Sequence, residues 1–224
     1  MQPYFFPYIG YWQLINAVDT FIIYDDVNFI KQGYINRNSI LQGQSSQRIT
    51  LQLIGSSSNV LIKDIKVGKN CKKLLKTIEQ SYQKAPHFEM VFPLVKNILE
   101  AEEINLAKFL GNSLQNICNY LEIDTKIIYS SDIEKDNTLK GQDKILSICQ
   151  NLKASKYINA IGGQELYSKE QFQKNNIELN FLQTEFTEYK QLTNDFIPYL
   201  SIIDILMFNS IDEVKVMLQR YELV

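Results

Sequence analysis

The sequence predicts one α/β domain over residues 1–224, in which a mostly parallel sheet is flanked by helices. Three observations lead to this prediction. Short β-branched or aromatic runs alternate with helical patterns towards both ends of the chain, which is the order of a parallel sheet. Two alternating segments in the middle are separated by a turn signal, which predicts a small β-hairpin. Residues from about 69–121 show helical periodicity, which predicts a helical insertion into a Rossmann-like sheet.

The chain opens with an aromatic loop that leads into a short helix and then a strand. The loop, Tyr4–Tyr8, is followed by Gly10 and by a short stretch with apolar residues at helical spacing. The run Thr20–Tyr24 is β-branched and aromatic, so we expect a buried strand. Asp25 and Asp26 follow directly and place carboxylates at the C-terminal end of that strand.

The expected hairpin lies in the middle of the chain. Arg48–Leu53 and Leu61–Val67 both alternate between apolar and polar residues. The stretch Gly55–Asn59 between them is rich in turn-forming residues, so we expect the two segments to pair antiparallel.

The insertion is predicted to contain helices over Cys71–Tyr82, about Met90–Glu100, and Leu106–Leu121. The first of them should stop before Pro86, because the residue before a proline avoids helical geometry. The third has the most regular amphipathic pattern in the chain.

Strands and helices then alternate to the end of the chain. The predicted strands are Lys126–Tyr129, Lys156–Asn159 and Ile177–Leu182. The predicted helices are Lys144–Leu152, about Lys169–Lys174, Ser201–Phe208 and Asp212–Tyr221.

Composition excludes several classes of protein. A net charge of −2 does not favour nucleic acid as a partner. Cys71, Cys118 and Cys149 lie far apart, which argues against a disulfide framework or a zinc site, and we predict no metal site. No apolar run is as long as a membrane span, and no signal peptide is recognisable, so we expect a cytoplasmic protein. The sequence does not define an oligomeric state.

Polar residues and glycines follow several of the predicted strands. Ligands of open parallel sheets bind outside the C-terminal ends of the strands. The loop from Gln2 to Tyr11, the pair Asp25-Asp26 and the pair Gly162-Gly163 should lie at such ends. One of Asp25 and Asp26 could cap a turn, or the pair could bind a metal or act as a base, and neighbouring residues of a strand point to opposite faces. The glycines could equally be simple turn residues.

A second polar group, Asn36, Arg37 and Asn38, lies between apolar residues. The planar guanidinium of Arg37 suits a carboxylate or phosphate, or it could tie the loop to Asp25 or Asp26. His87 is the one histidine, and no GxSxG, Walker A, GxGxxG or HExxH motif accompanies it. The lysines of the helix near Lys72 are expected to form a solvated face.

Several motifs resemble those of the WbqC-like family, in order along nearly the whole chain. They are Gln2–Tyr11, Ile23–Val27, Asn36–Asn38, Tyr82 with Ala85-Pro86 and Phe88, Gly162-Gly163 with Tyr167, and Ser201–Asp204. The resemblance implies a role in surface polysaccharide (O-antigen) biosynthesis, with transfer of glycine to a sugar as the proposed activity. Many members have a histidine before the Gln-Pro pair, where this chain has Met1.

The resemblance and the polar residues together predict an aminoacyl transferase acting on an amino sugar or sugar nucleotide. Asp25, Asp26 and Arg37 are the expected catalytic residues. The expected substrate-binding residues are Gln2, Tyr4, Gly10, Tyr11, Asn36, Asn38, Gly162, Gly163, Ser201 and Asp204. The opening also resembles class I nucleotidyltransferases and aminoacyl-tRNA synthetases, which makes ATP a candidate cofactor. Nucleic acid is expected only if aminoacyl-tRNA is the donor. The alternative is a non-catalytic sugar-nucleotide-binding or scaffold subunit.

A strand is expected before the aromatic loop. A strand-loop-helix opening needs about four or five apolar residues before Gln2, on the length of a short strand, and here Met1 stands directly against the motif. We therefore expect Gln2 to emerge beside the strand Phe21–Tyr24, with open space behind Met1.

Overall fold

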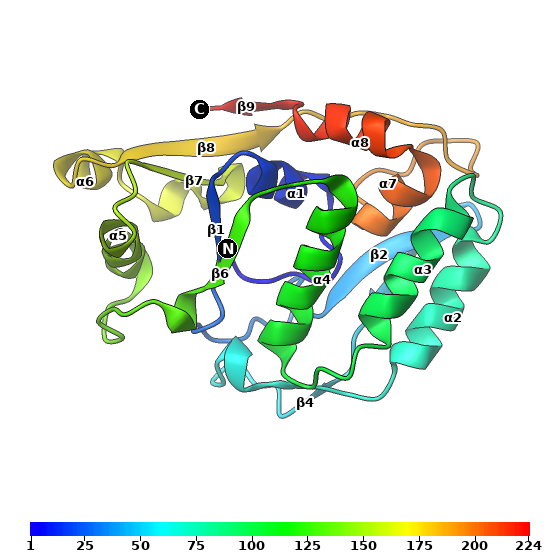
Figure 1. Ribbon diagram of the computed structural model, residues 1–224, viewed down its shortest axis with the longest axis horizontal. Helices are drawn as coiled ribbons and strands as arrows, with labels where there is room; N and C mark the ends of the chain where they lie inside the picture. Colours follow the sequence, from blue (N-terminus) through cyan, green and yellow to red (C-terminus); the bar gives the residue numbers. More distant parts are fainter.

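The computed structural model describes residues 1–224 as a mixed α/β protein (Figure 1). The N-terminal part contains α1 (Ile9–Asn16) and β1 (Thr20–Ile23). β1 pairs in parallel with β6 (Lys126–Tyr129), with Thr20 opposite Lys126. About a hundred residues of the chain lie between these two paired strands. The chain therefore leaves the sheet after β1 and returns to it at β6.

The middle of the chain differs from the predicted hairpin. β2 (Arg37–Gln42), which the sequence did not predict as a strand, pairs antiparallel with β3 (Ser45–Thr50) across a turn with Gly43 at φ 58°. Only the short β4 (Leu53–Ile54) pairs with β5 (Lys66–Val67). The predicted pairing of Arg48–Leu53 with Leu61–Val67 is therefore wrong over most of its length. The positive φ that Gly43 supplies allows a tighter turn than the longer Gly-Ser loop would.

The three helices of the insertion are confirmed, as α2 (Cys71–Tyr82), α3 (Phe88–Leu99) and α4 (Leu106–Leu121). Their apolar faces pack into one core of 44 buried residues that also contains the aromatic loop. The insertion and the N-terminal elements therefore share a single core.

The C-terminal part contains α5 (Gly141–Asn151), β7 (Lys156–Ala160), α6 (Lys169–Lys174), β8 (Glu178–Thr184), α7 (Ile202–Phe208), α8 (Ile211–Leu218) and β9 (Tyr221–Leu223). β7 and β8 are parallel, and β9 joins β8 antiparallel. The last predicted helix was expected to reach Tyr221, but it ends at Leu218 and Tyr221 begins β9.

The strands form four separate sheets, and one continuous Rossmann-like sheet is not observed. The parallel pair β1-β6 and the sheet β7-β8-β9 are not hydrogen-bonded to each other. Each of these two sheets nevertheless lies between the same two hydrophobic cores, a large one and a smaller one. Phe21 and Ile23 of β1 pack into the large core, whereas Ile22 and Tyr24 pack against a smaller core formed mainly by α5, α6 and β8. The alternation of side chains along β1 thus gives the sheet two covered faces.

Gly10 offers a test of the packing between α1 and β8. A Cβ at Gly10 would lie 2.4 Å from Thr184 Oγ1 and 2.6 Å from the Tyr8 hydroxyl, so both side chains would have to move. We expect Gly10→Ala to lower the free energy of unfolding by about 1–2 kcal/mol in urea titrations, since the overpacking outweighs the gain in helix propensity. Gly162→Ala is the matched control, because nothing lies within 4 Å of its added Cβ. Equal stability of the two variants would contradict the close packing at Gly10.

Candidate functional site

The aromatic loop is held by side chains that the sequence predicted to bind substrate. Asn38 Nδ2 donates hydrogen bonds to the carbonyl oxygens of Phe5 (3.2 Å) and Phe6 (2.7 Å). Ser201 Oγ also donates to the Phe6 carbonyl, at 2.8 Å. Phe6 has a φ of 44°, a left-handed conformation that is rare for a bulky residue. Asn38 and Ser201 are almost fully buried, so in this structure they fix the shape of the loop.

Three tyrosines form a cluster beside this loop. The rings of Tyr4 and Tyr11 have their centroids 5.3 Å apart, and Tyr34 packs on Tyr4 at 5.9 Å. The Tyr11 hydroxyl donates to the Gln2 carbonyl at 2.8 Å. Burial raises the pKa of both Tyr4 and Tyr11, so both phenols are neutral. Gln2, Tyr4 and Tyr11 are therefore neighbours, and Tyr34 is a further neighbour that the sequence did not single out.

Asn36 and Arg37 lie at the beginning of β2. Asn36 Nδ2 donates to the Leu51 carbonyl at 2.9 Å, while Asn36 Oδ1 and Arg37 Nε are buried without a hydrogen-bond partner. The Arg37 guanidinium also donates to the Lys31 carbonyl. It makes no ion pair with Asp25 or Asp26. The polar atoms left unpaired here are the ones that a bound ligand could satisfy.

Asp204 is the centre of a separate buried cluster. Its Oδ1 accepts from the Tyr82 hydroxyl at 2.8 Å. Its Oδ2 accepts from the Tyr189 hydroxyl at 2.6 Å and from Gln191 Nε2 at 2.7 Å. Desolvation raises the pKa of Asp204 even though these donors favour its charged form. The cluster joins α7 to α2 and to the loop before α7, which is a structural arrangement.

Asp25 and Asp26 face different partners at the C-terminal end of β1. Asp25 accepts from the backbone N–H and the hydroxyl of Ser131, at 3.0 and 2.7 Å. Asp26 lies between two lysines, 2.9 Å from Lys135 Nζ and 3.0 Å from Lys144 Nζ. All four charged side chains are nearly excluded from solvent.

The lysines control the ionisation of Asp26. Burial raises the pKa of the Asp26 carboxyl, but the adjacent ammonium groups of Lys135 and Lys144 outweigh it, and the net pKa is lowered. Lys144 Nζ also donates to the Asp26 carbonyl at 3.0 Å and lies 5.2 Å from the centre of the Tyr24 ring. Lys135 and Lys144 were not among the residues predicted for the site. A lysine next to Ile145 on the buried face of a helix was the available signal for Lys144.

The loop after β7 reaches the same region. Tyr24 and Tyr167 both pack against the smaller core, and a Cβ at Gly163 would lie 3.6 Å from the Tyr167 ring. Gly163 therefore lies beside a side chain that packs on the same small core as Tyr24. Gly162 is exposed.

The predicted site residues thus form three groups. Asp25, Asp26, Gly162 and Gly163 lie around the C-terminal ends of β1, β6 and β7. Gln2, Tyr4, Tyr11, Asn38 and Ser201 are grouped at the aromatic loop, with Gly10 at the start of α1, Arg37 at the start of β2 and Asn36 directly before it. Asp204 belongs to its own buried cluster. The Met1 carbonyl accepts from Tyr24 N at 2.7 Å, which places Gln2 at the junction of the first two groups.

The cysteines and the histidine are not part of the polar groups described above. Burial raises the pKa of Cys118 to about 12 and that of Cys149 to about 11, so both thiols are unreactive at neutral pH. His87 precedes α3, where its backbone N–H donates to the Met207 carbonyl.

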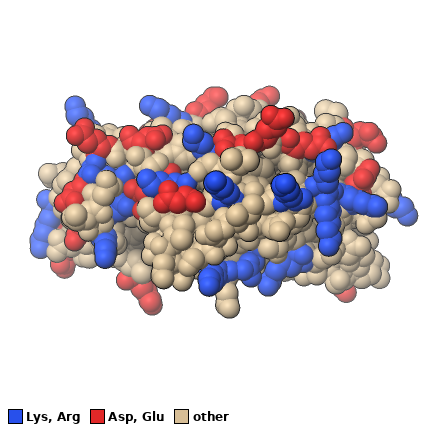
Figure 2. Space-filling model, turned by 90° about the horizontal axis from the view of Figure 1, so that it is seen from below, with Lys and Arg blue, Asp and Glu red and all other residues tan.

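Acidic and basic side chains are interspersed over the face seen in Figure 2. None of the helices is both long and apolar enough to span a membrane.

These features define a mixed α/β protein with a charged polar cluster at the C-terminal ends of parallel strands. The family model described as "WbqC-like protein family" matches residues 2–216, and the chain belongs to that family. It is 31% identical over 214 residues to the "Uncharacterized protein Rv1507c" of Mycobacterium tuberculosis, which covers 93% of this chain and 91% of that protein. No solved structure matched the chain.

Asp26→Asn tests the buried charge cluster. The substitution removes the negative charge and leaves Lys135 and Lys144 buried without a counterion. We expect the free energy of unfolding at neutral pH to fall by about 3 kcal/mol or more. Glu178→Gln is the matched control, because the Lys156–Glu178 pair is exposed and its loss should cost less than about 1 kcal/mol. Similar losses from the two substitutions would contradict a buried role for Asp26.

The pH dependence of the same variant tests whether charge is the cause. The folded pKa of Asp26 is below the ordinary value of 3.8, so its stabilisation is complete above that pH and is lost as the pH falls through the folded pKa. The difference between the wild type and Asp26→Asn should therefore stay constant from neutral pH down to about 4 and narrow below it. A difference that does not narrow would point to packing.

Proposed function

We propose that this protein is an aminoacyl transferase that moves an activated glycyl group onto the amine of an amino sugar or sugar nucleotide during surface polysaccharide assembly. One observation carries the proposal beyond family membership. Paired carboxylates with two buried lysines lie at the C-terminal end of β1, and a glycine pair follows β7; the C-terminal ends of strands are where parallel α/β proteins bind ligands. The proposed reaction takes place in the cytoplasm.

In the proposed reaction the sugar amine attacks the glycyl carbonyl. A C–N bond forms, the bond to the leaving group breaks, and the amine loses one proton. The leaving group is the phosphate of an adenylate made with ATP, the ribose oxygen of an aminoacyl-tRNA, or a thiol. Asp25 is assigned as the proton acceptor, because it has no lysine partner and its Ser131 partner is half-exposed. Asp26, held ionised by its two lysines, orients the amine.

The remaining residues are assigned to binding. Gly162 is exposed, and a Cβ there would meet nothing within 4 Å, so its backbone N–H suits the developing oxyanion better than that of Gly10, which is buried against Thr184 and Tyr8. Arg37 binds a phosphate or carboxylate of the substrate through its planar fork. The tyrosine cluster of Tyr4, Tyr11 and Tyr34 supplies aromatic surface for a sugar ring.

The second candidate is a non-catalytic subunit that binds a sugar nucleotide. The observation in its favour is that both Asp25 and Asp26 already have protein partners. Incubating the protein with a UDP- or dTDP-linked amino sugar, glycine and ATP separates the two candidates. Mass spectrometry should detect a glycyl amide of the sugar, and Asp25→Asn should abolish it. Binding of the sugar nucleotide without product formation would leave only the binding subunit.

Arg37→Lys tests the assigned anion contact. We expect binding of the sugar nucleotide to weaken by roughly tenfold in calorimetry, because lysine cannot reproduce the bidentate geometry. Tm without ligand should stay within a few degrees of the wild type. Arg48→Lys on the neighbouring strand is the control, since Arg48 is exposed. A large loss of Tm without ligand would show instead that Arg37 is structural.

A further inference from the structure

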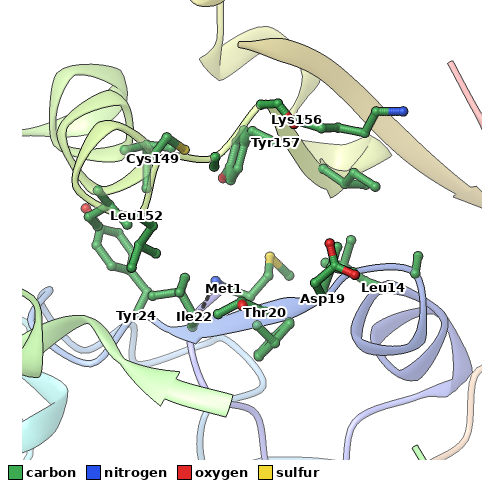
Figure 3. A pocket seen from close by; sticks show the side chains of 18 of the residues that line it. Met1, Leu14, Asp19, Thr20, Ile22, Tyr24, Cys149, Leu152, Lys156 and Tyr157 are labelled. Carbon is green, nitrogen blue, oxygen red and sulfur yellow. Dashed lines mark hydrogen bonds between the residues drawn. The ribbon is translucent and has the colours of Figure 1, made fainter. Parts of the chain in front are cut away.

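A groove separates β1 from β7. It has a volume of about 350 Å³ and is lined by 19 residues, 14 of them hydrophobic. One wall is the edge of β1 from Thr20 to Ile22 with Tyr24, and the opposite wall is the edge of β7 from Lys156 to Ile158. Figure 3 shows Met1, Thr20 and Ile22 along one side, with Tyr157 and Cys149 across the open space.

Helices close the groove on its two remaining sides. Leu14, Ala17 and Val18 come from α1 and the turn after it. Ile145, Ile148, Cys149 and Leu152 come from α5 and its C-terminus. Apolar helix faces on both sides and strand edges at both walls are the surroundings of a strand buried in the middle of a parallel sheet.

Both strand edges offer backbone groups to the groove. Lys126 N donates to the Asp19 carbonyl, so Asp19, Phe21 and Ile23 turn their backbone groups towards β6. Thr20 and Ile22 therefore turn theirs towards the groove. On the other wall, Glu178 N donates to the Ser155 carbonyl, so the alternate residues Lys156 and Ile158 face the groove.

The two walls run in the same direction. Gly10, near the start of α1, lies against Thr184 at the end of β8, and α1 ends shortly before β1 begins. A helix that starts beside the end of β8 and finishes shortly before the start of β1 is the arrangement found between parallel strands. β7 is parallel to β8, so it is parallel to β1 as well.

Met1 already occupies one position of the missing ladder. Its α-amino nitrogen donates to the Ile22 carbonyl at 2.9 Å, and its carbonyl accepts from Tyr24 N at 2.7 Å. One residue bonded to the two residues that flank its partner is the parallel pattern. This confirms the expected position of Met1 and Gln2 beside β1. Burial lowers the pKa of this amino group to about 5, and an amide N–H in its place would make the same bond without a charge.

We propose that the groove holds one further strand, parallel to β1 and β7, whose last residue is Met1. Such a strand is apolar on both faces and bonds to the backbone of Ile22 on one side and Ile158 on the other. Counted as the first strand, it joins the separate sheets in the order β6-β1-first-β7-β8-β9. That is the order 3-2-1-4-5-6 of a doubly wound dinucleotide-binding sheet. The proposal concerns the sheet and does not depend on the transferase activity.

The test adds four residues directly before Met1 of the full chain. One variant carries Val-Ile-Val-Ile, a second carries the more soluble Val-Thr-Val-Thr, and the control carries Gly-Ser-Gly-Ser. We expect both β-branched extensions to raise Tm by several degrees relative to the control. Hydrogen exchange of the Ile22 and Ile158 amides, which face the groove, should slow in both and stay unchanged in the control.

Three results would overturn the proposal. In the first, the Ile22 and Ile158 amides exchange at the control rate with both β-branched extensions. In the second, these amides become more protected as the concentration of the chain without any extension rises, and light scattering reports a dimer. The occupant of the groove would then be a second copy of the chain. A Val-Pro-Val-Pro extension separates strand pairing from simple apolar contact, because proline removes donors that the ladder needs. Equal protection from this extension would also overturn the proposal.

Discussion

The buried carbonyls of the aromatic loop are the constraint on which much of the structure depends. Phe5, Phe6 and Pro7 are fully buried in an irregular segment, so their backbone oxygens need donors from elsewhere in the chain. Asn38 of β2 and Ser201 before α7 supply them, and Trp12 Nε1 donates to the Pro7 carbonyl at 3.0 Å. Segments almost two hundred residues apart are thereby fixed around one loop.

This constraint explains why polar residues were difficult to interpret from sequence. Asn38, Ser201 and Asp204 stand in motifs that suggest binding, and the structure places all three in buried hydrogen-bond networks within the protein. An irregular buried loop needs the same residue types as a ligand site, because both present unpaired backbone groups. Residue type and spacing therefore could not separate the two roles. Asn36 Oδ1 and Arg37 Nε, by contrast, are buried without a hydrogen-bond partner in the protein, and Gly162 is exposed.

Helices with a regular spacing of apolar residues could be predicted from the sequence. Strands whose position depends on distant pairing partners could not. The helices α2 and α4 follow from their amphipathic spacing, which is a local property. The strand β2 was missed because Arg37–Gln42 has few β-branched residues, and its place in the sheet depends on β3 and on Tyr82, whose hydroxyl accepts from Leu41 N. Lys135 and Lys144 could not be paired with Asp26 from sequence, because more than a hundred residues separate them from it.

The sheet and the candidate site meet at one short stretch of backbone. Met1 is bonded to both Ile22 and Tyr24, Gln2 follows it, and the Tyr11 hydroxyl is anchored on the Gln2 carbonyl. Asp25 and Asp26 follow Tyr24 on the neighbouring strand. The relative position of the tyrosine cluster and the carboxylates is therefore set by how firmly Met1 is held against β1. A strand filling the groove would hold Met1 from both sides and would exclude water from the cores on the two faces. Completing the sheet would then order the site as well as stabilise the fold, because the same two hydrogen bonds serve both.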